Sequence, residues 1–140
     1  RTFFITGVQM EVGSVATPFE NRSFGEELHL CKRYYNLLTT GAASKYISMA
    51  SAYNTAQFTG VIQLNPTMRA TPTIDIVTGT NYYRCVVDAT NFSFDVLAID
   101  GADNKQVLWA KGGLNSITSG SGGWLQTTNT ASYMAFQAEL

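Results

Sequence analysis

One histidine and two adjacent glutamates are the residues that first suggest acid–base chemistry. His29 could join a serine and an aspartate in a nucleophilic triad, or bind a metal with Glu26 and Cys31. Glu26 and Glu27 could form the carboxylate pair of a glycoside-cleaving enzyme. No spacing in the chain brings partners to His29, and adjacent residues point in different directions on a helix. We therefore expect a solvated or hydrogen-bonded helix histidine and no catalytic site.

An oxygen-rich cluster around Gly101 could hold Ca²⁺. It consists of Asp95, Asp100, Asp103 and Asn104, and Ca²⁺ prefers carboxylate and amide oxygens. Their spacing does not follow the acidic loop of known Ca²⁺ motifs, and these residue types are ordinary turn formers. The cluster is interpreted as a turn, and we expect no metal and no cofactor.

Aromatic residues are the best candidates for contact with a receptor or glycan, because a sugar's C–H face stacks on a ring while amides bind its edge. The candidate contacts are Trp124, Trp109, Tyr82, Tyr83, Asn115 and Gln126. Each ring could instead fill the core, where large aromatic side chains dominate burial, and this second interpretation is favoured for each of them. Trp124 is the most favourable for exposure because it follows a glycine-rich turn.

A capped helix is expected from Ser23. The run Ser23-Phe24-Gly25-Glu26 has the form of a capping box, in which hydroxyl and carboxylate each bind a free backbone amide. The run Thr39-Thr40-Gly41 would end the helix after roughly 14 residues. Apolar residues at spacings of four, three and four form a stripe, the candidate subunit interface: Phe24, Leu28, Cys31 and Tyr35. The stripe could contact other subunits or pack on the chain's own sheet, and the sequence leaves both open.

The remaining segments have the alternation of strands. Val8, Met10 and Val12 share one face of an expected strand, Thr2–Val12. After Ala42 no segment has a helical period. The further expected strands are Lys45–Ala52, Gln57–Leu64, Thr71–Thr78, Tyr82–Asp88, Phe92–Ile99, Lys105–Ala110, Trp124–Thr128 and Ala131–Glu139. One helix followed by many short strands predicts a mainly β protein, an antiparallel, jelly-roll-like β-sandwich.

Composition excludes two classes of partner. The net charge of −1 gives no field for capturing nucleic acid, and no apolar window is long enough to insert into a membrane. Charged residues make up only 14% of the chain, and from Val107 onward only Lys111 and Glu139 are charged. Edge strands usually carry charge to prevent foreign pairing, so we expect another subunit to cover part of this surface.

Three motifs carry a resemblance to a known family. The run VQMEVGSVATPFENRSFGEELHLCKRYY, from Val8 to Tyr35, resembles the joint of bacteriophage tail-fibre and virion fibre proteins. In that joint a QLEVGS-like strand leads through TPFE into a helix that ends in CxRYY, and here QME replaces QLE. The runs Met68–Thr73 (MRATPT) and Phe136–Leu140 (FQAEL) are similar to two further marks of the same C-terminal domain. No specific motif lies between Ile74 and Tyr133.

The resemblance implies an organisation and a function. Residues 1–20 would end a preceding carbohydrate-binding-module-like domain, residues 21–41 would be a connecting helix, and residues 42–140 would form a C-terminal β-sandwich domain. The protein would be a non-enzymatic homotrimer of the virion, in a tail or head fibre, assembled in the host cytoplasm. Its partners would be other virion proteins and a host surface glycan or receptor. A start at Arg1 without Met leads us to expect the end of a longer polypeptide.

Two alternatives remain beside this function. The first is a capsid-decorating (cement) or baseplate protein, whose partner would be the virion itself. The second is a glycan-cleaving tailspike, which would need two carboxylates about 5–10 Å apart across a groove.

Overall fold

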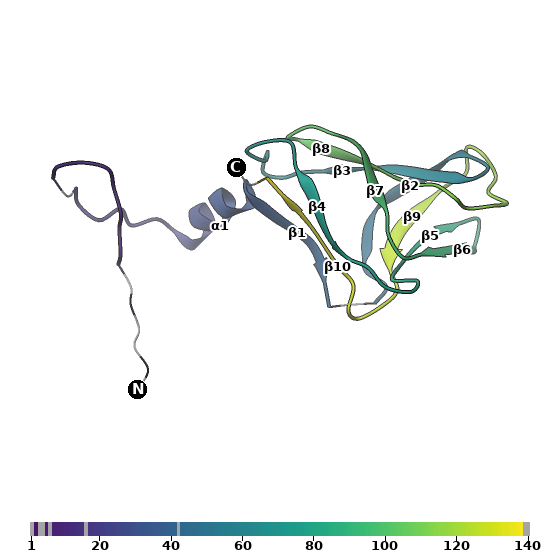
Figure 1. Ribbon diagram of the computed structural model, residues 1–140, viewed down its shortest axis with the longest axis horizontal. Helices are drawn as coiled ribbons and strands as arrows, with labels where there is room; N and C mark the ends of the chain where they lie inside the picture. Colours follow the sequence, from purple (N-terminus) through teal and green to yellow (C-terminus); the bar gives the residue numbers. More distant parts are fainter. Residues whose placement is uncertain (1, 3–4, 6, 16, 42, 139–140) are drawn as a thin grey trace.

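The computed structural model describes residues 2, 5, 7–15, 17–41 and 43–138. Phe3, Phe4, Glu139 and Leu140, which belong to the expected terminal strands and motifs, lie outside the described residues. The described chain is mainly β, with one helix and antiparallel sheets, as the sequence predicts (Figure 1). The elements are α1 (Phe24–Lys32), β1 (Tyr35–Thr40), β2 (Tyr46–Asn54), β3 (Gln57–Gln63), β4 (Thr73–Val77), β5 (Tyr83–Val87), β6 (Thr90–Phe94), β7 (Ala98–Ala102), β8 (Gln106–Lys111), β9 (Gly122–Thr127) and β10 (Tyr133–Gln137).

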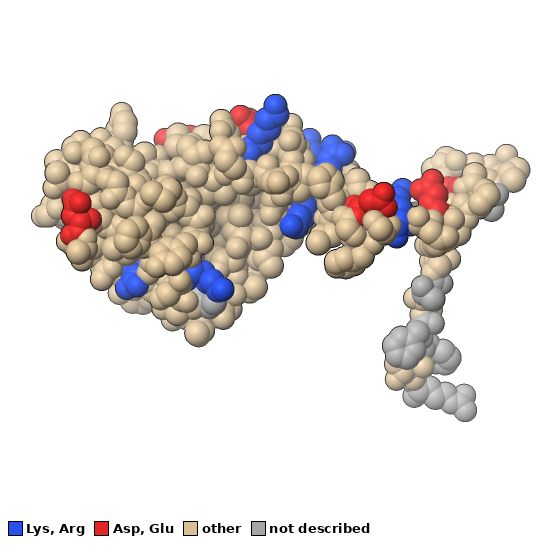
Figure 2. Space-filling view, turned by 180° about the vertical axis from the view of Figure 1, so that it is seen from behind, with Lys and Arg blue, Asp and Glu red and all other residues tan. Residues whose placement is uncertain are grey.

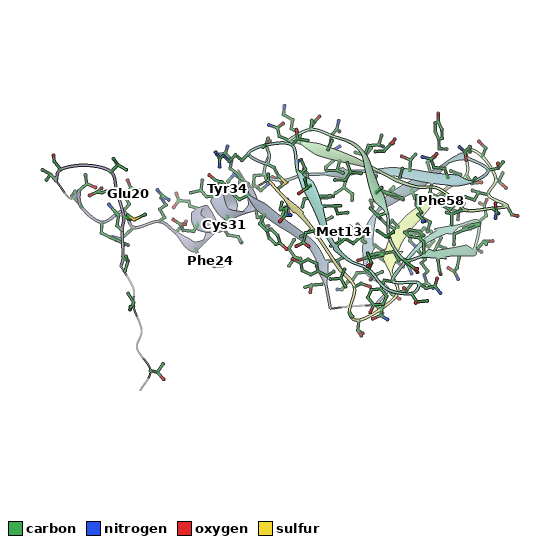
Figure 3. All side chains as sticks on the ribbon, viewed as in Figure 1. Glu20, Phe24, Cys31, Tyr34, Phe58 and Met134 are labelled. Carbon is green, nitrogen blue, oxygen red and sulfur yellow. The ribbon has the colours of Figure 1, made fainter. Side chains whose placement is uncertain are left out.

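The strands form two sheets that share one core. The smaller sheet has the order β1-β10-β4 and the larger one β6-β5-β9-β2-β3-β8-β7. Met134 and Phe136 of the smaller sheet belong to the same buried cluster as Phe58 of the larger one. Figure 3 labels Met134 and Phe58 on the two sheets. The Tyr83 hydroxyl, on β5, lies 2.8 Å from the carbonyl oxygen of Val77 and 2.7 Å from that of Tyr133, so it ties the sheets together. The arrangement is a β-sandwich, and its likeness to a jelly roll stays a prediction.

The larger sheet is strongly curled. β6 and β7 lie at its opposite edges, yet only three residues separate Phe94 from Ala98. Such a connection spans at most about 14 Å, whereas six strand spacings of a flat sheet measure about 29 Å. Ring contacts across the curl agree: Phe92 on β6 lies 5.2 Å from Phe58 on β3, and the Lys111 Nζ on β8 lies 5.9 Å from the Phe94 ring. The single strand expected over 92–99 is therefore wrong, because the chain leaves one edge and enters the other there.

The helix is shorter than expected. Its cap is confirmed: the Ser23 side chain accepts from the Glu26 amide, and the Glu26 carboxylate accepts from the Ser23 amide. The helix ends at Lys32, and the residues expected to continue it form β1. β1 pairs antiparallel with β10, from Tyr35 opposite Gln137 onward. A ladder with a strand far along the chain thus overrides the apolar period that predicted a helix.

Strand position explains the low charge of the last third of the chain. β9 lies between β5 and β2, and β10 lies between β1 and β4, so both are central strands. Central strands have their backbone groups paired on both sides and need no charge to prevent foreign pairing. Cover by a second subunit is therefore not needed to explain the missing charges. Figure 2 shows the sandwich largely free of charged side chains on the face in view.

The chain before α1 forms an arm that projects from the sandwich (Figure 1). The strand expected here is wrong for the described residues, because residues 7–15 form no strand and pair with no described strand. Val8, Met10 and Val12, which would share its inner face, are all exposed. The helix–β1 junction is better anchored: Arg33 and Tyr34 carbonyl oxygens accept from the amides of Arg69 and Ala138.

Candidate functional site

The structure separates the aromatic candidates into one exposed and several buried residues. Trp124 lies on β9 with 38% of its surface exposed. Trp109 is fully buried at 0%, and its indole Nε1 donates to the Ser48 hydroxyl at 2.9 Å. Tyr83 is also fully buried, and burial raises the pKa of its hydroxyl. The core interpretation that the sequence favours is confirmed for Trp109 and Tyr83, and the alternative of ligand contact is wrong because neither ring reaches the surface.

The other candidates lie in three different environments. Tyr82 is half-buried and packs against the core. Asn115 is exposed in the loop between β8 and β9 and does not line the cavity at Trp124. Gln126 is almost completely buried, so its predicted direct contact with a ligand is also wrong. Its Oε1 instead accepts from the Trp124 Nε1 at 2.8 Å. Of the six predicted contacts, the structure brings together Trp124 and Gln126.

Trp124 borders an open, mostly apolar cavity of about 440 Å³ on the outer face of the larger sheet. The Tyr46 ring meets Trp124 edge-on, with centroids 6.0 Å apart and planes at 66°. Met49 stands directly opposite Trp124 in the β2–β9 ladder. The remaining lining residues are Ile47 and Ser48. Two exposed aromatic rings around an apolar cavity, with one amide fixing the indole, form a surface suited to a flat ligand with apolar faces.

A strand irregularity creates this cavity. In a regular strand Tyr46 and Met49, three residues apart, would point to opposite faces of the sheet. The β2–β9 register shifts between Tyr46 and Ser48, so both Tyr46 and Met49 face outward and are 73% exposed. Ile47 is the extra residue at this irregularity, and it packs against the core. Simple alternation places Tyr46 on the inner face with Ala50 and gives no sign of the irregularity, so the sequence does not predict that Tyr46 and Met49 share one face with Trp124.

A second depression, of about 270 Å³, lies on the other half of the sheet. It is bounded by Val61, Leu108 and the β7–β8 turn, where Asp103 lies. The Asp103 carboxylate accepts from the amides of Lys105 at 2.7 Å and Gln106 at 3.0 Å. The bond from the Lys105 amide is the main cause that lowers the Asp103 pKa. Asp103 thus serves the turn, as the sequence predicts, and is not free for a ligand.

The acid–base candidates also serve local structure. Glu26 is engaged in the helix cap, and the hydrogen bond from the Ser23 amide holds its pKa below the usual value. Glu27 pairs with Arg22 at 3.2 Å, and Arg22 pairs with Glu20 at 2.8 Å. His29 is exposed on α1. Across the described residues, no three His, Cys, Asp or Glu side chains come close enough to hold a metal ion.

The candidate subunit interface is exposed but is not one helical stripe. Phe24 (83% exposed), Leu28 and Cys31 lie on α1, and α1 buries none of its residues (Figure 3). Tyr35 belongs to β1 instead, where its hydroxyl donates to the Asp75 carboxylate at 2.9 Å. The expectation of a four-residue helical stripe is therefore wrong at Tyr35. Packing of α1 on the chain's own sheet is minor, since only the side bearing Leu28 and Lys32 faces Pro66 across a shallow depression.

Polar residues of the arm close a loop. The Glu11 carboxylate accepts from the Thr17 amide at 2.5 Å and from the Thr17 hydroxyl at 2.6 Å, and the Gln9 Oε1 accepts from the Glu20 amide at 2.9 Å. The Thr17 hydroxyl is the main cause that holds the Glu11 pKa below its usual value. The polar positions of the first motif are thus bonded to one another, while its apolar side chains point to solvent. The arm and α1 together present unpaired apolar surface.

A wider open depression of about 830 Å³ lies between this arm and α1. Its carboxylates and its guanidinium are already engaged, because Glu26 caps the helix and Arg22 pairs with Glu20 and Glu27. The Trp124 cavity is therefore the better candidate for a ligand.

Comparisons of the chain with protein-family models, with curated proteins and with solved structures gave no match. No helix among the described residues is both long and apolar enough to cross a membrane.

Proposed function

We propose that this chain is a non-enzymatic component of a bacteriophage fibre that attaches to the host surface by binding a glycan on the outer face of its larger sheet. The observation that carries the proposal is the exposed Trp124 ring, held by Gln126 at the border of an apolar cavity. A pyranose presents apolar C–H faces that pack on such a ring. Tyr46 offers a second ring at an angle, which would contact a neighbouring side of the sugar.

Assembly into a homotrimer within the virion belongs to the same proposal. The exposed apolar side chains of α1 and the arm, such as Phe24 and Met10, support contact with other copies or with other virion proteins. Three weak sites on one particle raise the overall affinity by orders of magnitude without any new contact. A shallow cavity such as the one at Trp124 therefore suffices for attachment.

A capsid-decorating or baseplate role is the second candidate, and the same apolar arm supports it. A protein of that kind would attach through α1 and the arm and would not use Trp124. A glycan-cleaving tailspike is the third. The five residues that line the Trp124 cavity include no carboxylate, so a cleaving enzyme would have to place its acid and base elsewhere.

The test uses the purified chain and Trp124→Ala on an array of bacterial surface polysaccharides. Wild type is expected to bind at least one polymer, and Trp124→Ala is expected to lose at least tenfold in affinity. Tyr53→Ala is the control, because Tyr53 is an exposed aromatic ring on β2 that does not line the cavity. Equal losses for both variants, or no binding by wild type, would sink the proposal and favour the structural role. Shortening of the bound polymer would identify a tailspike.

A further inference from the structure

One charged residue lies beside Trp124 on the outer face of the larger sheet. Backbone pairing aligns two rows of outward-facing residues across β6, β5, β9 and β2. The first row is Asn91, Val86, Trp124 and Met49, and the second is Ser93, Arg84, Gln126 and Tyr46. Arg84 faces outward because its neighbours Tyr83 and Cys85 are fully buried in the core. These eight positions include no carboxylate, and Arg84 is the single charge among them.

Arg84 has no counter-charge in the described chain. Its Nε is buried without a hydrogen-bond partner, and no described residue forms an ion pair or hydrogen bond with its guanidinium. A guanidinium stays charged at any physiological pH, and a buried donor left unpaired destabilises the fold. Most such groups have a partner in native proteins, so an unpaired one calls for an explanation. A bound ligand anion would supply the counter-charge that the described chain does not give the Arg84 guanidinium.

Gln126 connects Arg84 to the ring that would hold the sugar. It stands opposite Arg84 in the β5–β9 ladder and accepts from the Trp124 indole at 2.8 Å. Trp124 and Arg84 are therefore diagonal neighbours, about 7–8 Å apart, and one sugar ring with its acidic substituent can reach across both positions. The planar guanidinium fork matches a carboxylate or a phosphate, either of which it binds through two parallel hydrogen bonds.

We propose that the outer face of the larger sheet binds an anionic saccharide, with the sugar ring packed on Trp124 and its acidic group paired with Arg84. This inference rests on the proposed glycan-binding function and adds the chemical class of the glycan. The shared chemistry is an anion on a sugar, which a uronic acid supplies as a carboxylate and a phosphorylated polymer as a phosphate. A neutral glycan would leave Arg84 unpaired in the complex as well.

The test measures binding of the full chain to acidic bacterial polysaccharides. Each uronic-acid polymer is paired with its carboxyl-reduced form, and each phosphorylated polymer with its dephosphorylated form. The variants are Arg84→Gln, which removes the charge, Arg84→Lys, which keeps it without the fork, and Trp124→Ala. Lys105→Gln is the control for the loss of one positive charge, because Lys105 is exposed in the β7–β8 turn away from Trp124. Equal thermal midpoints show that all four variants fold.

Wild type is expected to bind an acidic polymer about tenfold or more tightly than its neutralised partner. Arg84→Gln should bring that ratio close to one, Arg84→Lys should leave an intermediate ratio, and Lys105→Gln should leave it unchanged. The tighter of the two acidic classes identifies the anion. Two results would contradict an anionic ligand and leave the proposed function standing. One is a preference for neutral polymers that depends on Trp124. The other is a ratio of acidic to neutralised affinity that Arg84→Gln does not change. No binding to any polymer would overturn both.

Discussion

The indole Nε1 of Trp124 donates a 2.8 Å hydrogen bond to the Oε1 of Gln126, two residues along the same strand. Alternation places both side chains on one face of the sheet, the amide almost fully buried and the ring partly exposed. The buried amide therefore fixes the orientation of an exposed ring. Such pre-orientation lowers the entropy that a side chain loses when a ligand immobilises it.

Gln126→Leu tests this role. The substitution removes the acceptor at similar volume, so the Trp124 ring is expected to become mobile and polysaccharide affinity to fall roughly threefold to tenfold. Titration of the variant measures the affinity, and acrylamide quenching of tryptophan emission reports the ring. Trp109 contributes a constant background because it is fully buried. Unchanged affinity together with increased quenching would show that ring orientation does not matter for binding.

Neighbouring atoms lie so close to the Gly60 backbone that a side chain there is expected to destabilise the fold. A Cβ at this position would lie 2.8 Å from the Trp109 indole and closer still to the Met49 carbonyl oxygen. Gly60→Ala should therefore destabilise the protein by about 1–3 kcal/mol, measured as the free energy of unfolding in urea. Gly101→Ala is the matched control, because nothing lies within 4 Å of a Cβ added there. Equal effects of the two substitutions would contradict this packing.

The Cys85 thiol predicts a loss of stability at alkaline pH. Burial raises its pKa to about 12 from 9.0, so the folded state keeps its proton where the unfolded state loses it. Its contribution to stability is complete below pH 9 and is lost as the pH rises towards 12. Between pH 8 and pH 10 the free energy of unfolding should fall by about 1.4 kcal/mol more in wild type than in Cys85→Ala. Urea titrations at the two pH values measure the difference, and parallel losses would contradict a buried thiol.

The helix cap is expected to stabilise the first turn of α1 without changing the stability of the sandwich. Ser23→Ala removes the acceptor of the Glu26 amide and should destabilise the first turn by about 1 kcal/mol, so that this amide exchanges roughly fivefold faster. Ser23→Asn keeps an acceptor and should restore slow exchange. The thermal midpoint of the sandwich should not change, because α1 buries none of its residues. A lower midpoint would mean that the helix supports the sandwich.

The exposed apolar side chains of α1 are expected to form the contact between subunits of a trimer. Sedimentation equilibrium should give wild type about three times the 15.3 kDa mass of one chain. Phe24→Glu combined with Leu28→Glu should give the mass of one chain, because two carboxylates cannot be buried unpaired in a subunit contact. Tyr53→Glu, at an exposed position on the sandwich, should leave the trimer intact. A trimer that survives the double substitution would place the contact elsewhere.

Local signals predicted the start of the helix and the strands of the core. The Ser23 cap depends on residues three apart, and the alternation of apolar side chains identified β3, β5, β8 and β10 to within about two residues at most ends. The end of the helix could not be predicted, because β1 exists through its ladder with β10, which lies at the other end of the chain. The break after Phe94 has a similar cause, since only the curl of the sheet brings its edges together.

The candidate site was predicted in part. The glycine-rich turn before Trp124 correctly indicated exposure, whereas Trp109 alternates in step with Val107 and is buried with it. The cavity beside Met49 was missed because the register shift before Ser48 turns Tyr46 to the outer face, and no residue type indicates this shift. Arg84 was missed because only the structure shows that its guanidinium has no partner among the described residues. A sequence does not show which side chains are paired.

The short connection between β6 and β7 determines where the protein tolerates extra sequence. Because residues 95–97 hold together two edges that a flat sheet would keep apart, a peptide inserted there would let the sheet open and expose the core. The loop between β8 and β9 does not join the two edges of the sheet, and its residues 112–116 are mostly exposed. Engineered epitopes or affinity tags therefore belong at Gly112 and Gly113, which have open space around them, and before Leu114, which packs against the core.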